Sequence, residues 1–317
     1  MEKRWKLQRS LWILALFLAG CGGGGTESQP AAVSQEKNEV EAALSSGEDA
    51  TLLSSDVAFE EDDQEGTEEG SGLSKPLFES HLEPLLPTWH RHLTHRERTV
   101  DIHIERGVAD LTVTRLLDGF LHLDVDGNGD KGKKEFQVNA RRFATFERKG
   151  PRSWKLIELS PIEYTMRDPN KQTVQIEWVK GTVGDLVRAE VTDPAGLFVF
   201  PDGLPTFHPA EEVLVEAKVS NKNDDGSERP TRVFLHHRFR KDSDHTRESM
   251  YDDGTHGDRT AGDGVFTLLK TVGEKIGFHQ ATVDALDGAV FDDETTQNYN
   301  GEAWKIPYRV TETPVIP

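Results

Sequence analysis

The clearest pattern along the chain is an alternation of apolar and polar residues, which has the period of a β-strand. It is strongest in residues 171–180, where Val174, Ile176 and Trp178 share one face. The same alternation recurs in 100–104, 111–113, 136–140, 153–159, 211–220, 232–240, 264–269, 276–286 and 303–310. Turn residues separate these segments, and no long amphipathic helix interrupts them. The pattern predicts an all-β fold of two antiparallel, sandwich-like domains.

The start of the chain follows a different pattern. Residues 1–9 hold four basic residues, and an apolar run over 11–18 is too short to span a bilayer stably. We interpret 1–20 as a secretory signal peptide. Small residues precede Cys21, which is the only cysteine in the chain.

The sequence Leu18-Ala19-Gly20-Cys21 resembles the lipobox of bacterial lipoproteins. In that family the signal is cut before the cysteine, which is then acylated on its sulfur and on its new amino group. The resemblance implies that Cys21 is lipidated and anchors an exported protein. Because Gly22 follows it, and not aspartate, the resemblance further implies the outer membrane or the cell surface. An ordinary signal peptide with a chance cysteine, or an uncleaved membrane segment, stays open.

Residues 21–75 are predicted to be a disordered acidic tether. Four glycines follow Cys21, and residues 22–75 hold 14 acidic residues against 2 basic ones. The segment has few aromatic residues to bury, and its like charges repel one another, so it cannot offset the entropy lost on ordering. A helical tendency in 36–44 has little to pack against.

The rest of the chain is predicted to form two domains. Residues 76–200 make a β domain and residues 201–317 an immunoglobulin-like sandwich, because turn sequences at 193–196 and 200–203 mark a boundary. No disulfide holds either domain, since no cysteine follows Cys21. The net charge of −19 argues against nucleic-acid binding. We expect the membrane as one partner, through Cys21, and an envelope protein or glycan as another.

A stretch of alternating acidic residues and glycines, 124–135, resembles an EF-hand calcium loop. Asp124, Asp126 and Asn128 stand at loop positions 1, 3 and 5, and a glycine stands at position 6. Asp130 would offer its backbone carbonyl at position 7, and Glu135 both carboxylate oxygens at position 12. The segments on both sides alternate like strands, whereas an EF-hand has helices there. The sequence predicts calcium in an isolated loop, and a hairpin loop with exposed acids stays open as the alternative.

A second acidic stretch, 251–266, resembles a signature of immunoglobulin-like domains in bacterial surface proteins, including the choice-of-anchor X type. Its acids are Asp252, Asp253, Asp258 and Asp263, and a glycine and an aromatic residue close it. We expect a structural turn, with aspartates accepting backbone N–H groups and glycines at positive φ. A second calcium site is the alternative.

Two groups of histidines are interpreted as structural. His81, His90, His92 and His95 are expected on a surface loop, because no nearby carboxylate or cysteine completes a metal set. His236 and His237 are neighbours in a strand, so they point to opposite faces and do not chelate one ion. One of them is expected to be half-buried and the other exposed.

No motif of a serine hydrolase, zinc protease or phosphate-binding loop is present. The sequence therefore predicts a non-enzymatic binding or structural role, with calcium and no organic cofactor. Two alternatives stay open. One is an envelope hydrolase with paired carboxylates, and the other is a calcium sensor with helices around 124–135.

Overall fold

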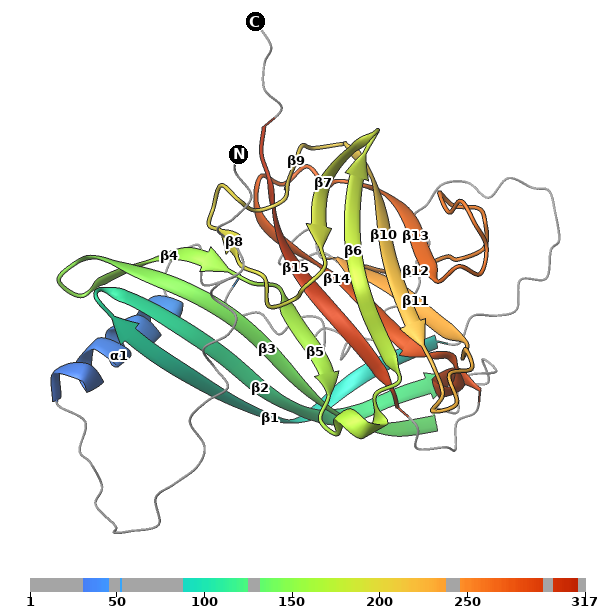
Figure 1. The fold of residues 1–317 in the computed structure, drawn as a ribbon, viewed down its shortest axis with the longest axis horizontal. Coiled ribbons are helices and arrows are strands. Elements are labelled where there is room, and N and C mark those ends of the chain that lie inside the picture. Colours follow the sequence, from blue (N-terminus) through green and yellow to red (C-terminus); the bar gives the residue numbers. More distant parts are fainter. Residues whose placement is uncertain are drawn as a thin grey trace, which may run out of the picture. The chain divides into compact units, whose positions relative to one another are not determined.

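The computed structural model describes residues 31–45, 52, 88–124, 132–237, 246–292 and 299–312. The chain divides into two compact units, 1–35 and 36–317, and the description below concerns the second. The fold is all-β, as predicted, with its strands arranged in two sheets (Figure 1). Within the described ranges, no helix is both long enough and apolar enough to cross a bilayer.

The larger sheet begins with three long antiparallel strands, β1 (Thr88–Glu105), β2 (Val108–Asp124) and β3 (Gly132–Gly150). Arg106 and Gly107 connect β1 to β2 with φ of 51° and 80°, the two positive φ values that a tight hairpin turn requires. Burial alternates along β2, so that one face is core and the other is half-buried. Two shorter strands, β4 (Ser153–Leu159) and β5 (Ile162–Met166), fold back onto β3.

The same sheet continues into the C-terminal part of the chain. Strand β5 pairs with β15 (Gly301–Val310), followed in order by β14 (Gly277–Asp287), β11 (Thr231–His237) and β12 (Thr246–Met250). Short strands β8 (Phe198–Val199) and β9 (Thr206–Phe207) join its rim, and β9 runs parallel to β15. A 3₁₀ turn, η3 (Gly288–Phe291), follows β14.

The smaller sheet has four antiparallel strands in the order β13 (Val265–Thr271), β10 (Glu212–Asn221), β6 (Val174–Val183) and β7 (Leu186–Val191). One hydrophobic cluster joins it to the larger sheet, with Val179 and Ala217 on one side and Val283 and Trp304 on the other. The two sheets therefore pack face to face as a sandwich.

The boundary expected near residue 200 does not separate the two sheets. Strand β6 precedes it and pairs with β10, which follows it. Strand β5 likewise pairs with β15. Each sheet thus contains strands from both predicted domains, which local sequence patterns cannot reveal because strand pairing is long-range.

The helix α1 (Ala31–Leu44) lies inside the segment predicted to be a disordered tether. Its residues Val40 and Leu44 are buried in one cluster with Leu111 and Phe146 of the larger sheet. The expectation that residues 36–44 have little to pack against is therefore wrong. The helical tendency is real, and the apolar inner face of β2 and β3 supplies the surface that stabilises it.

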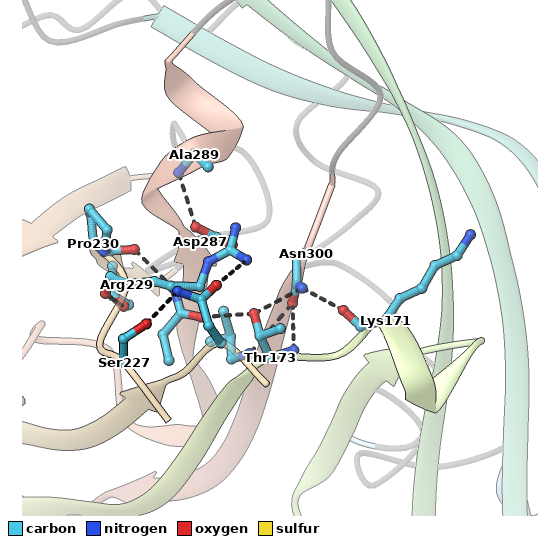
Figure 2. A network of polar contacts seen from close by, with 12 residues as sticks. Lys171, Thr173, Ser227, Arg229, Pro230, Asp287, Ala289 and Asn300 are labelled. Atoms are coloured by element: carbon cyan, nitrogen blue, oxygen red, sulfur yellow. Dashed lines mark hydrogen bonds and ion pairs between the residues drawn. The ribbon is translucent and has the colours of Figure 1, made fainter. Parts of the chain in front are cut away.

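Polar side chains also connect the two halves of the chain, as Figure 2 shows. The Asn300 side chain donates to the Lys171 carbonyl at the end of η2 (Pro169–Lys171), at 2.5 Å, and accepts from the Thr173 N–H at 3.2 Å. The Thr173 hydroxyl donates to Asn221 at 2.7 Å. Beside them, Arg229 forms an ion pair of 2.5 Å with the buried Asp287.

Candidate functional site

The loop predicted to bind calcium connects β2 to β3. Asp126, Asn128 and Asp130 lie outside the described residues, while Asp124 ends β2 and Glu135 lies within β3. Both flanks are strands, as their alternation predicted, so the interpretation as a sensor with helical flanks is wrong. The strands stay paired up to Leu123 and Gly132.

The strand register separates the first and last predicted ligands of this loop. Glu135 lies opposite Phe120, four residues before Asp124. At about 3.3 Å per residue, the two acids are about 13 Å apart along the strands. Calcium binds its oxygens at about 2.3–2.6 Å, so two of its ligand oxygens lie within about 5 Å of each other. The pairing of β2 with β3 therefore does not by itself bring the carboxylates of Asp124 and Glu135 together.

The second acidic stretch forms a compact turn between β12 and β13. Asp252, Asp258 and Asp263 each direct a carboxylate oxygen to a common point, with the three oxygens within 4.8 Å of one another. Asp258 is buried, Asp252 is half-buried and Asp263 is exposed. Elsewhere in the described ranges, no other group of three His, Cys, Asp or Glu converges as closely.

Backbone N–H groups hold these carboxylates in place. Asp252 accepts from Gly262, Asp263 and Gly264 at 2.7, 3.1 and 2.8 Å. Asp258 accepts from Gly254 and Thr260 at 2.7 and 3.1 Å. These bonds, with φ of +74° at Gly254 and Gly262 and +78° at Gly264, match the structural turn that the sequence predicted.

The fourth acid of this stretch, Asp253, points to other partners. Its carboxylate accepts from both the N–H and the hydroxyl of Thr255 at 2.7 Å. The hydrogen bond from the Thr255 hydroxyl lowers the pKa of Asp253. Asp253 thus shapes the turn and does not join the converging carboxylates.

The three converging carboxylates suit a hard divalent cation. Calcium takes six to eight oxygens, and carboxylate oxygens that accept one N–H keep a second lone pair. An ion at this point would offset the mutual repulsion of Asp252, Asp258 and Asp263. Backbone carbonyls of the turn and water would have to supply the remaining ligands.

His236 and His237 both lie in the interior, with exposed fractions of 2% and 5%. They face opposite sides of β11, as expected, but neither is on the surface, because β11 is covered on both faces. His236 contacts Asp284 at 3.0 Å. Burial, with Lys270 and His236 as neighbours, lowers the pKa of His237 to about 3, so this ring stays neutral.

A buried polar cluster around Arg91 and Asp284 was not predicted from the sequence. Arg91 of β1 donates to both carboxylate oxygens of Asp284 on β14, at 2.7 and 3.0 Å, and to the Tyr299 hydroxyl at 3.0 Å. Burial alone would raise the pKa of Asp284, but Arg91 and His236 outweigh it and hold the pKa well below its ordinary value. Asp284, between apolar residues of β14, was the available signal in the sequence. Arg91 lies in a strand with several other charged residues, so nothing local distinguishes it.

A cavity between the two sheets is almost entirely apolar. It has a volume of about 100 Å³ and is lined by side chains that include Val215, Val283 and Ile306. Small-molecule sites typically measure about 300–1,000 Å³. This cavity is therefore interpreted as a packing gap between the sheets.

No protein-family model matches the chain, and no curated protein matches it at a significant level. The resemblances to lipoproteins, EF-hand loops and choice-of-anchor domains therefore depend on their motifs alone.

The buried Glu302 predicts a pH-dependent stability. Burial raises the pKa of Glu302 to about 7, against hydrogen bonds from the Ile176 N–H at 2.9 Å and the Trp304 indole at 2.7 Å. Because the protonated carboxyl is favoured in the native state, Glu302 contributes its full stabilisation below pH 4.5, the pKa in the unfolded chain. This contribution falls as the pH rises and is lost at about pH 7, the pKa in the native state. The loss amounts to roughly 3 kcal/mol.

Urea denaturation between pH 4.5 and 7 tests this. The glutamine of Glu302→Gln does not titrate, so the unfolding free energy of this variant should not fall over that range as the wild-type value does. Its unfolding free energy should nevertheless be lower than that of wild type, because the amide places an N–H donor where the carboxylate accepts hydrogen bonds. The exposed Glu177→Gln should keep the wild-type slope. Parallel slopes for Glu302→Gln and wild type would contradict the assignment.

Proposed function

We propose that this chain is an exported protein, anchored to the envelope membrane through lipidated Cys21, with a non-catalytic binding or structural role. In this proposal the β sandwich holds a calcium ion at the acidic turn of residues 251–264. The observation that carries it is the convergence of Asp252, Asp258 and Asp263 within 4.8 Å.

The register of β2 and β3 favours this turn over loop 124–135 as the calcium site. Glu135 pairs with Phe120, four residues before Asp124, whereas the three aspartates of the turn already converge. The turn also connects β12 to β13 and contacts β10 through a hydrogen bond from Lys218 to the Asp263 carbonyl. An ion here would stabilise the join between the two sheets.

A structural role fits an extracytoplasmic location. Calcium is plentiful there, so a weak site with a Kd of about 10⁻⁴–10⁻³ M would stay filled. Such a site acts as a fixed part of the fold, because its occupancy does not change with signalling. The unidentified envelope protein or glycan remains the expected partner of the anchored sandwich.

Calcium should therefore stabilise the protein. For a Kd of about 1 mM, about 10 mM calcium adds roughly 1.4 kcal/mol to the unfolding free energy, measured by urea denaturation. Asp258→Asn should abolish this increment, and the exposed Asp225→Asn should retain it. No increment in wild type would refute calcium binding. An increment that survives Asp258→Asn but disappears in Glu135→Gln would assign the ion to loop 124–135.

The anchor is tested separately by labelling cells with radioactive palmitate. The wild-type chain should incorporate label, and Cys21→Ser should not, because no other cysteine can accept the lipid. Gly20→Ala keeps a small residue before the cysteine and should remain labelled. Label on Cys21→Ser would disprove lipidation at this position.

A further inference from the structure

Strand pairing brings three histidines together on the outer face of the larger sheet. His90 and His92 are two residues apart on β1 and so share a face. His122 on β2 lies directly opposite His90. The rings of His90 and His122 stack with centroids 4.7 Å apart, and those of His92 and His122 meet edge to face at 6.3 Å.

We propose that His90, His92 and His122 form a binding site for a transition-metal ion of the zinc class. The inference does not depend on calcium binding or on the lipid anchor. The structure places His90, His92 and His95 in β1 and not on the expected surface loop, while His81 lies outside the described residues. In this proposal the third ligand comes from a strand 30 residues further on.

The backbone spacing suits three imidazoles around one ion. Directly opposite residues have Cβ atoms about 4.5–5.5 Å apart, and residues two apart on a strand are about 6.6 Å apart. His122 lies on the diagonal from His92, at about 7–8 Å. As they stand, the ring nitrogens of the three histidines do not converge within 4.8 Å of one another. Imidazole nitrogens bind zinc at about 2.0–2.1 Å, so the rings would have to rotate about their side-chain bonds to share one ion.

The sheet beneath the histidines holds these positions rigidly. Strand β2 is paired on both sides, and Leu121 and Leu123, which flank His122, are completely buried. His122 and His90 are half-buried, and His92 is exposed. The three line a surface hollow with Thr94, Phe120 and Lys133. Water or a ligand can therefore reach a fourth coordination position, as at catalytic zinc sites.

The donor set selects the class of ion. Neutral imidazole binds zinc, copper and nickel, whereas calcium requires hard oxygens. The histidine site and the acidic turn should therefore take different metals. Lys133 lies opposite His122, with its ammonium 5.9 Å from the centre of the Phe120 ring, and its charge opposes the binding of a cation. Glu135, opposite Phe120, is the acidic neighbour on this face.

Calorimetric titration of the untagged protein with Zn²⁺ tests the proposal. Wild type should bind one ion, and His122→Ala and His92→Ala should each weaken binding roughly 100-fold. Loss of a group that only hydrogen-bonds to a metal ligand already weakens binding by about 10- to 100-fold, and loss of a ligand should cost at least as much. The exposed His103→Ala, on the same strand, should bind as wild type. Lys133→Gln should bind more tightly, which a purely structural role of the histidines would not produce. Co²⁺ should give the visible absorption of a four-coordinate site.

His92→Ala keeps the test valid if His122→Ala does not fold, because His92 is exposed. Absence of Zn²⁺ binding in wild type would overturn the proposal. Wild-type affinity in His92→Ala and His122→Ala would overturn it as well. Binding lost in Asp258→Asn but kept in both histidine variants would place the zinc at the acidic turn, and would also refute it.

Discussion

The buried ion pair between Arg91 and Asp284 fastens the first long strand to the C-terminal part of the larger sheet. Both side chains are almost completely buried, with exposed fractions of 1% and 2%. Removing two charges from water is costly, and close geometry with additional hydrogen bonds offsets that cost. Here both carboxylate oxygens bind Arg91, one of them also contacts His236, and Tyr299 accepts from the guanidinium. Removing one partner would leave an uncompensated buried charge.

Aromatic packing surrounds this ion pair and fixes the start of β1. Trp89 meets Phe234 edge to face at 5.2 Å, and the guanidinium of Arg247 lies 3.8 Å from the centre of the Trp89 ring. Arg247 also donates to the Trp89 carbonyl at 2.8 Å. Because neighbouring residues on a strand face opposite ways, anchoring Trp89 and Arg91 inside fixes His90 and His92 outside. The core thus determines the geometry of the proposed metal site.

The strands and the acidic turn were predicted from local sequence patterns, whereas contacts that depend on strand pairing were not. Alternation predicted the strands, and the acidic turn at Asp252 has the hydrogen bonds expected of it. Loop 124–135 matched a calcium motif in spacing alone, but the register places Glu135 opposite Phe120. His122 was not connected to His90, although a hairpin centred on Arg106 and Gly107 brings them together. The packing of helix α1 was not predicted, because the residues of β2 and β3 that it contacts lie far away in the sequence.

The segments on either side of residue 200 form one body, and the ion pair of Arg91 with Asp284 fastens them together. Amide hydrogen exchange of the Asp284→Asn variant examines this connection, because the variant leaves Arg91 buried without its full countercharge. Exchange should become faster both in β14 and in β1–β3, and Asp225→Asn should exchange as wild type. Acceleration confined to residues beyond 200, with β1 unchanged, would contradict it.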